Sequence, residues 1–402
     1  MSEVWVNNLS NENNTGGPTI SGITTYSGRH FFVPPQGDTA SRPSDCEPGS
    51  FRFNTDNAKL EYFRGNTIGW TEIEAEDVEI AGVSGSSGSI DGKGTRMLFA
   101  GGYTPSSNPN DTFNNVDAIT VETLGNSIDF NNLTGNFTGM ANFGDTTRAV
   151  AAGGIGPRAY APGSTTNQIQ FCTFASTGDY ADSGGDLTRS NMFMGCFNNK
   201  VRGVICGGSY PYDDTMDYVT IQTLGNAVDY GDLPAKAGYA AGLSSSTRGF
   251  IIGGIRVSAP DTASYNTITV HTTSSTGAGT DFGDISSTRY EMASGSNATR
   301  GIVAAGYGPN YTNIIQFITM ATTGDASDFG DLTGFNGTGK GGAASPVRFV
   351  LGGGYGTSPH FMNTIEFVQI ATTGNSKDFG DLQGFGRRVP NQVSNNNGGV
   401  SG

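Results

Sequence analysis

The stretch that decides the fold is RFVLGGGYGTSPHFMNTIEFVQIATTGNSKDFGDL, residues 348–382. It opens with a short apolar run that ends in glycines, which is typical of a strand buried on both faces. The part NTIEFVQIATT, residues 363–373, largely alternates apolar and polar side chains and is rich in β-branched residues, as in a half-buried strand. The glycines favour sharp turns and close backbone approach. The stretch therefore predicts three or four short strands joined by turns.

The same unit recurs six times from about Thr95 onward. Its first anchor is an arginine followed by a glycine pair, except that Arg300 is followed by Ala305-Gly306. The six arginines are Arg96, Arg148, Arg202, Arg248, Arg300 and Arg348. The second anchor is DFGDL or a variant of it, which starts at Asp129, Asp182, Asp229, Asp281, Asp328 and Asp378. A period of about 50 residues is that of one blade in kelch-type propellers. We therefore expect an all-β chain whose residues 95–402 form a six-bladed kelch-like β-propeller.

The region before the repeats is expected to contain three parts. Residues 1–30 form an extended N-terminal arm, and residues 31–81 form a small β attachment module with a hairpin around a polar turn. Residues 82–94, GVSGSSGSIDGKG, form a flexible linker. A module this small has little core, so we expect it to trimerise or to dock onto other proteins. Residues 386–395, GRRVPNQVSN, are expected to pair beside the strand that starts at Arg96 and to cover its free edge.

Composition narrows the range of functions. The formal net charge is −14, and a negative surface repels phosphate backbones, so we expect no nucleic-acid partner. No apolar run is long enough to span a bilayer, so we expect no membrane insertion. The N-terminus lacks the features of a signal peptide, which favours synthesis in a cytoplasm. Four cysteines without a Cys-x-x-Cys pair and three histidines argue against a zinc site, and we expect buried thiols and no metal.

The loops after the glycine pairs are the candidate binding surface. They vary in length between copies, and function concentrates on loops that a rigid scaffold holds. Aromatic residues there are suited to stacking on sugar rings, although ordinary packing between loops is the alternative. The candidate binding residues are Tyr103, Tyr160, Tyr210, Tyr212, Tyr307, Tyr311, Tyr355, His360 and Phe361.

The repeated charged residues fit a structural role better than a catalytic one. The arginines are candidates for clamps on carbohydrate or carboxylate groups, or for contacts to backbone carbonyls and aspartates between neighbouring repeats. Aspartate pairs such as Asp328 and Asp331 suit turn capping, the acid and base of a glycosidase, or calcium, whose ligands are oxygens. Their recurrence in nearly every copy favours the scaffold. No catalytic set or phosphate loop can be assembled, so we expect no enzyme and no cofactor.

Two patterns resemble known families. The arginine and glycine-pair anchor resembles kelch-type propellers, although the tryptophan that kelch repeats carry is missing. The version of the repeat with TTG and DFGDL is similar to virion structural proteins of tailed marine bacteriophages, of the tail fibre and baseplate type. A pattern before the repeats is similar to short β modules of such proteins. It consists of Ser50, Arg52 to Asn54, Lys59 to Glu61, Phe63, Gly65 and Trp70.

The phage resemblance implies a virion structural protein, made in the host cytoplasm and located on the tail or another external appendage. Its N-terminal region would attach to other virion proteins, and its propeller would contact a host-surface glycan or protein, or neighbouring virion proteins. Copies of the chain, expected as a homo-oligomer, would bind by multivalent adhesion. Two alternatives remain. One is a capsid decoration or assembly protein without a host ligand, and the other is a glycan-cleaving propeller enzyme.

Overall fold

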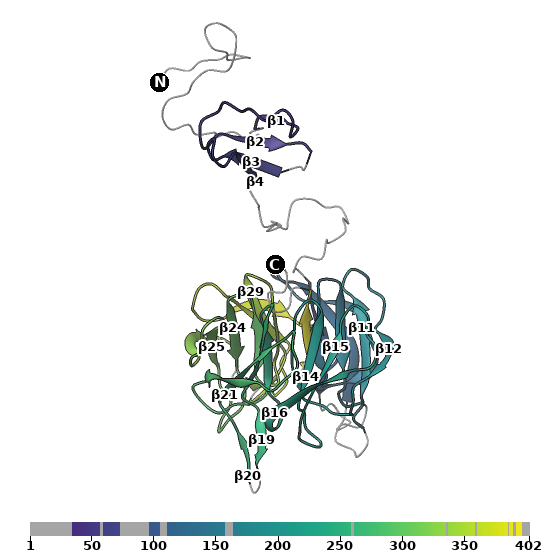
Figure 1. Ribbon diagram of the computed structural model, residues 1–402. Coiled ribbons are helices and arrows are strands. Elements are labelled where there is room, and N and C mark those ends of the chain that lie inside the picture. The colour runs from purple at the N-terminus through teal and green to yellow at the C-terminus, as the bar shows by residue number, and fades with distance from the viewer. Residues whose placement is uncertain are drawn as a thin grey trace, which may run out of the picture. The chain divides into compact units, whose positions relative to one another are not determined.

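The regular elements of the protein are β-strands. Every element in the described part of the chain is a strand, so the predicted all-β class is confirmed (Figure 1). The chain divides into two compact units, Met1–Ser84 and Gly85–Gly402. The expected arm, 1–30, and the expected linker, 82–94, lie outside the described residues. The computed structural model describes residues 34–56, 59–72, 96–104, 111–156, 164–258, 261–334, 337–357, 360–384, 386–388 and 391–395.

The first unit contains one sheet with the strand order β1-β2-β3-β4. β2 and β3 form the predicted hairpin, with Phe51 opposite Tyr62 and Phe53 opposite Leu60. β1 runs parallel to β2, and β4 runs antiparallel to β3. The strands are β1 (Gln36–Gly37), β2 (Phe51–Asn54), β3 (Lys59–Phe63) and β4 (Trp70–Glu72).

The two faces of this small sheet differ in burial. Arg52 and Glu61 are buried, whereas Phe51 and Leu60 are 48% and 40% exposed. The carboxylate of Glu61 accepts a 2.7 Å hydrogen bond from Nε of Arg42. The segment that carries Arg42 thus covers the face of Arg52 and Glu61, whereas Phe51 and Leu60 lie on the more exposed face.

We call the six arginines of the first anchor the register arginines. Four sheets of the second unit have four antiparallel strands each, and the second strand of each begins at a register arginine. The first contains β9 (Ala141–Gly144), β10 (Arg148–Ala152), β11 (Gln168–Thr173) and β12 (Ala181–Asp186). The next contains β17 (Ala241–Ser244), β18 (Arg248–Ile252), β21 (Thr267–Thr272) and β22 (Thr280–Asp284). Another contains β23 (Ala293–Ser296), β24 (Arg300–Ala304), β25 (Ile314–Thr319) and β26 (Ser327–Asp331). The last contains β28 (Gly341–Ala344), β29 (Arg348–Gly352), β31 (Thr364–Gln369) and β32 (Lys377–Asp381).

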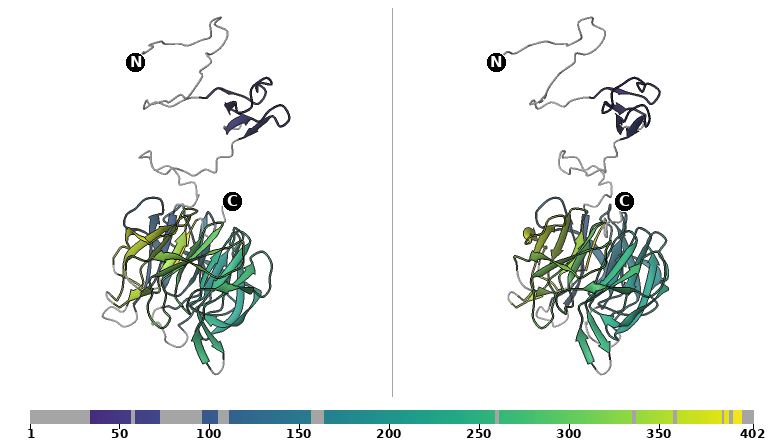
Figure 2. Two further views of the ribbon diagram at one scale, coloured as in Figure 1. Left: turned by 90° about the vertical axis from the view of Figure 1, so that its left-hand side faces the viewer. Right: turned by 60° about the vertical axis from the view of Figure 1, so that its left-hand side comes forward.

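A further sheet of the second unit continues into a hairpin. Its order is β13-β14-β15-β16-β19-β20, and the β19–β20 hairpin projects from one end of the unit (Figure 2). Its strands are β13 (Gly195–Asn198), β14 (Arg202–Cys206), β15 (Asp213–Thr220), β16 (Val228–Gly238), β19 (Ile255–Ser258) and β20 (Asp261–Ser264). A separate antiparallel pair consists of β27 (Gly337–Thr338) and β30 (Tyr355–Gly356).

The remaining sheet joins the two ends of the repeat region. β33 pairs antiparallel with β5, with Asn391 opposite Ala100 and Ser394 opposite Met97. This confirms the pairing expected for residues 386–395. β5 also pairs with β7, which pairs in turn with β6 and β8. The strands are β5 (Arg96–Ala100), β6 (Tyr103–Thr104), β7 (Asp111–Thr120), β8 (Ile128–Phe137) and β33 (Asn391–Ser394).

In each of the six sheets we call the edge strand that pairs with the strand of the register arginine the first strand; the first strands are β9, β13, β17, β23, β28 and β33. The first strands contact one another in series. β9 contacts β13, β13 contacts β17, β17 contacts β23, and β23 contacts β28. β28 contacts β33, and β33 contacts β9, so the series returns to the strand where it began. The core lies between neighbouring sheets. Ile302 of β24 and Phe349 of β29 belong to one buried cluster, and Val350 of β29 and Met97 of β5 belong to another. Burial of these apolar side chains stabilises the packing of sheet on sheet.

Each register arginine joins its own sheet to a segment further along the series. Arg300, for example, stacks 4.7 Å over the ring of Phe317. Its guanidinium then donates to carbonyl groups of another repeat, which suits a planar fork with several donors. The arginines and their carbonyl partners are Arg96 with Phe174, Arg148 with Ile221 and Gln222, Arg202 with Ser274, Arg248 with Met320 and Ala321, Arg300 with Ile370 and Ala371, and Arg348 with Val121.

The six anchor aspartates lie on the fourth strands, and all six are exposed. Asp182 and Asp229 accept hydrogen bonds from the nearby amides of Gly184 and Gly231, at 2.9 and 3.1 Å. The other anchors are Asp129, Asp281, Asp328 and Asp378, and each lies on a different sheet. Because the six are spread over six sheets, they do not converge on one site.

Candidate functional site

Residues with left-handed backbone conformation precede the first strands. Phe193, Tyr239 and Glu291 have φ angles of 53°, 58° and 52°, and Gly139 and Gly339 hold the corresponding positions. A residue with a Cβ rarely adopts such angles, and those that do concentrate at functional sites. We call these five residues the left-handed series. Their backbones are bonded in order, from the amide of Phe193 to Gly139 O (2.7 Å), Tyr239 to Phe193 O (2.8 Å), Glu291 to Tyr239 O (3.0 Å) and Gly339 to Glu291 O (3.1 Å).

The left-handed series lines a cavity of about 150 Å³, here called the central cavity. Its walls come from the first strands and the residues just before them. Met140, Met194 and Met292 contribute apolar surface, and Asn142 and Gln392 contribute polar surface. The central cavity is therefore amphipathic, as small-ligand sites usually are.

A continuous series of aromatic rings leads away from the central cavity. Tyr239 belongs to both features, because it lines the cavity and stacks on Phe193. Apart from the buried Phe193, the rings are half-buried and leave part of their surface exposed. We call the series the aromatic arc. Its centroid distances are 4.4 Å for Phe193–Tyr239, 6.0 Å for Tyr239–Tyr290, 5.6 Å for Tyr290–Tyr307, 4.9 Å for Tyr307–Tyr311, 6.1 Å for Tyr311–Tyr355, 5.1 Å for Tyr355–Phe361 and 6.3 Å for Phe361–Tyr103.

An ion pair lies beside the aromatic arc. Nη2 of Arg388 donates to Oε1 of Glu291, and the Arg388 guanidinium lies 5.9 Å from the ring centre of Tyr355. The second carboxylate oxygen of Glu291 accepts a 2.9 Å hydrogen bond from Thr338 Oγ1. Burial raises the pKa of Tyr290, and the neighbouring charge of Glu291 adds to the rise. The arc thus combines apolar ring faces with phenol groups and with one fixed pair of charges.

The structure brings together most of the binding residues predicted from the sequence. Six of them lie at one end of the aromatic arc or directly against it: Tyr103, Tyr307, Tyr311, Tyr355, His360 and Phe361. Tyr212 lies near Tyr210 and Glu291. Burial is the main cause that raises the pKa of Tyr212, and the charges of Tyr210 and then of Glu291 add to the rise. Tyr210 is 58% exposed. Tyr160 lies outside the described residues.

Sequence reasoning missed the other end of the arc and the charged pair. Phe193, Tyr239, Tyr290, Glu291 and Arg388 precede the first strands rather than following a glycine pair. In the sequence, the segments that carry Tyr239 and Tyr290 are rich in small residues and were interpreted only as the ends of repeats. One signal was present in the sequence. Bulky or charged residues stand at a position where two other repeats have glycine, which marks side chains held in a glycine-like conformation.

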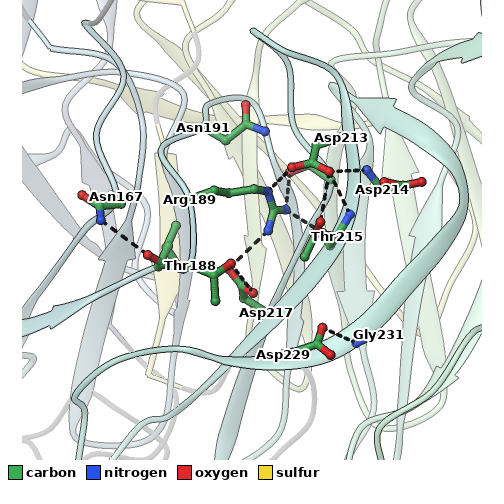
Figure 3. Close-up of polar contacts among 12 residues, drawn as sticks. Asn167, Thr188, Arg189, Asn191, Asp213, Asp214, Thr215, Asp217, Asp229 and Gly231 are labelled. Carbon is green, nitrogen blue, oxygen red and sulfur yellow. Dashed lines mark hydrogen bonds and ion pairs between the residues drawn. The ribbon is translucent and has the colours of Figure 1, made fainter.

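Charged side chains elsewhere join the segment before a sheet's first strand to the third strand of the same sheet (Figure 3). Arg189 donates to the carbonyl groups of Gly207 and Thr215 at 3.1 and 2.6 Å, and it pairs with Asp213 and Asp217. Burial acts to raise the pKa of Asp213, but hydrogen bonds from Thr215 and the charge of Arg189 keep it below its usual value. These carboxylates are therefore held by structural partners, as are those of Asp117 with Arg387 and Glu366 with Lys340.

Three of the thiols, those of Cys172, Cys196 and Cys206, are not activated. Burial raises the pKa of Cys172 and of Cys196 to about 11, and it also raises that of Cys206. A thiol with a raised pKa has little thiolate at neutral pH and is a poor nucleophile. All four cysteines, including the partly exposed Cys46, are unbridged.

The remaining observations do not point to a particular activity. Within the described ranges, no group of three or more His, Cys, Asp or Glu side chains is placed to hold a metal ion. The same residues include no helix long and apolar enough to cross a membrane. Compared with known proteins, the chain matches no protein-family model and no curated protein. The functional proposal therefore rests on the sequence and geometry of the chain itself.

Proposed function

We propose that the sheets of the second unit are the blades of a six-bladed kelch-like β-propeller. The contact series of the first strands supports this, because each strand in a ring of six contacts two others. The pairing of β33 with β5 supports it too, since one sheet then contains both ends of the repeat region. Propellers that join their ends in this way leave only short, protected sheet edges.

We propose further that the protein is a non-enzymatic binding protein of a phage virion, associated with the tail. The resemblance of the repeats and of the segment around Arg52 to tail fibre and baseplate proteins supports this location. The N-terminal unit attaches the chain to other virion proteins. The propeller presents the aromatic arc to glycans of the host surface, and several copies on one particle add up weak contacts.

The aromatic arc is the observation that carries the binding role. Its half-buried rings expose apolar faces next to phenol groups, and sugars likewise combine an apolar ring face with hydroxyl groups. Binding without cleavage is favoured by the state of Glu291, the acid beside the arc. Both of its carboxylate oxygens are already engaged, one by Arg388 and one by Thr338. A glycosidase needs a pair of carboxyl groups across the bond that it cleaves.

Binding of the full-length chain to an array of bacterial surface glycans and to whole host cells tests the proposal. Tyr311→Ala removes a ring from the middle of the arc and is expected to weaken binding about tenfold, the effect of losing about 1.4 kcal/mol. Val347→Ala is the matched control. Val347 is 51% exposed and precedes β29, whereas the arc lies beyond the other end of that strand.

Three outcomes contradict the proposal. If the unmodified chain binds no glycan and no cell, the proposal of a host-surface ligand is wrong. If it binds only other virion proteins, a decoration or assembly role is favoured. Shortening of a bound polysaccharide during incubation favours the glycan-cleaving alternative. If Tyr311→Ala and Val347→Ala lose glycan affinity equally, binding does not depend on the aromatic arc.

A further inference from the structure

The central cavity has the size and lining of a ligand site in its own right. Its volume is about 150 Å³, and a cavity of about 150 Å³ holds one benzene-sized ring. Met140, Met194 and Met292 supply apolar walls that adapt to the shape of a ligand. Phe193 and Tyr239 also line it, and they begin the aromatic arc. A molecule that fills the cavity therefore comes into contact with the arc as well.

Two residues that line this cavity carry buried hydrogen-bond acceptors without partners. Asn142 on β9 and Gln392 on β33 both line it, and each is 7% exposed. These two strands contact each other. In the described part of the chain, neither Oδ1 of Asn142 nor Oε1 of Gln392 accepts a hydrogen bond. Leaving a buried acceptor unpaired costs about 1–3 kcal/mol, so a ligand with hydrogen-bond donors gains affinity here.

We propose that the central cavity receives the terminal sugar of a glycan chain, while the aromatic arc contacts the sugars that follow it. The inference rests on the proposed function and adds the mode of recognition. The hydroxyl groups of the terminal sugar donate to Asn142 and Gln392, and its apolar face lies against the methionines. Because the cavity holds only one ring, the rest of the chain lies outside it, where Tyr239 leads to Tyr290.

The polar groups around the cavity favour a neutral sugar. Glu291 lines the cavity with its charge paired to Arg388, and the unpaired amide oxygens of Asn142 and Gln392 are acceptors that would repel a sugar carboxylate. Lys340 also lines the cavity, but it is buried and lies 3.6 Å from the carboxylate of Glu366. The expected terminal residue is therefore a neutral sugar without a bulky substituent, such as a hexose, and not a uronic acid.

Competition with free sugars tests the inference on the unmodified full-length chain. The chain is bound to a glycan that the array identifies, and neutral monosaccharides or hexuronates are added. At least one neutral monosaccharide is expected to displace the glycan and to raise the midpoint of thermal unfolding, because a ligand of the folded state stabilises it. Hexuronates are expected to do neither. A glycan whose terminal residues are chemically capped is expected to bind about tenfold more weakly.

Variants of the two acceptors provide the second measurement. Asn142→Leu and Gln392→Leu are each expected to weaken glycan binding about tenfold and to abolish competition by the monosaccharide. Val347→Ala, which changes an exposed residue outside the cavity and outside the aromatic arc, is the control. If capped glycans bind unchanged and no monosaccharide competes, while Tyr311→Ala still weakens binding, the inference is wrong and the proposed function stands. If the unmodified chain binds no glycan, both are wrong.

Discussion

The side chains of Arg387 and Asp117 form a 2.8 Å ion pair although 270 positions separate them in the sequence. Both are buried, and burial raises the pKa of Asp117 while the charge of Arg387 lowers it. Arg387 belongs to the last repeat and Asp117 to the first. The pair therefore connects the same two repeats that β33 and β5 join through their backbones.

Removal of one partner of this pair is expected to be costly. Arg387→Ala leaves the carboxylate of Asp117 buried without a counter-charge, and such changes lower the free energy of unfolding by about 3–5 kcal/mol. The double variant Arg387→Met with Asp117→Leu replaces both charges by apolar groups and is expected to recover most of the loss. Urea unfolding measures all three proteins. A double variant as unstable as Arg387→Ala would contradict the explanation.

A comparison of two register arginines measures how much the contact with an aromatic ring adds to stability beyond the hydrogen bonds to carbonyl groups. Arg300 and Arg248 each donate to two carbonyl groups of another repeat. Arg300 also stacks on Phe317, whereas Val270 holds the corresponding position beside Arg248. Arg300→Ala is therefore expected to lower the free energy of unfolding by about 0.5–1 kcal/mol more than Arg248→Ala does. Equal losses would mean that the stacking contributes nothing.

Substitution of two glycines tests whether the backbones of neighbouring repeats approach each other closely. Gly330 and Gly374 have similar φ angles of 146° and 152°, a region that residues with a side chain avoid. A Cβ on Gly330 would lie 2.5 Å from the carbonyl oxygen of Gly374, but a Cβ on Gly374 would meet no atom within 4 Å. Gly330→Ala is expected to destabilise the protein by at least about 1 kcal/mol more than Gly374→Ala, as measured by chemical unfolding. Similar losses would assign the whole cost to the φ angle.

The buried histidine predicts a pH dependence of stability. Burial lowers the pKa of His271 to about 4, and its ring stacks on Phe197 at 5.4 Å. Unfolded chains bind the proton below about pH 6.5, so between about pH 6.5 and 4 the unfolded state holds more protons. The free energy of unfolding therefore falls as the pH falls, by roughly 3 kcal/mol from this group alone.

His271→Gln removes this contribution. Its stability is expected to fall less steeply than that of the unmodified chain between pH 6.5 and 4. His360→Gln is the control, because His360 is exposed. Thermal unfolding at several pH values measures the three proteins. Parallel curves for His271→Gln and the unmodified chain would show that His271 is not held neutral by the fold.

The strands were predictable because their patterns are local. Alternation in residues 363–373 indicated β31, and the apolar run after Arg348 indicated β29. The aromatic loop residues were also predictable as candidates, since they follow glycine pairs. The end of the arc formed by Tyr239 and Tyr290 was not predicted, because its signal, a bulky or charged residue where other repeats have glycine, appears only when the repeats are compared. The central cavity depends on contacts between residues as distant in sequence as Asn142 and Gln392, and no local pattern encodes them.

The pairing of β33 with β5 also affects how the chain is made. During translation β5 emerges early, while its partner β33 is synthesised only after all the intervening repeats. Until then one edge of β5 has free amide and carbonyl groups that can pair with another chain. On a messenger read by many ribosomes at once, neighbouring nascent chains are the nearest source of such a strand. Exchange of β33 between chains is the misassembly that this order of synthesis favours.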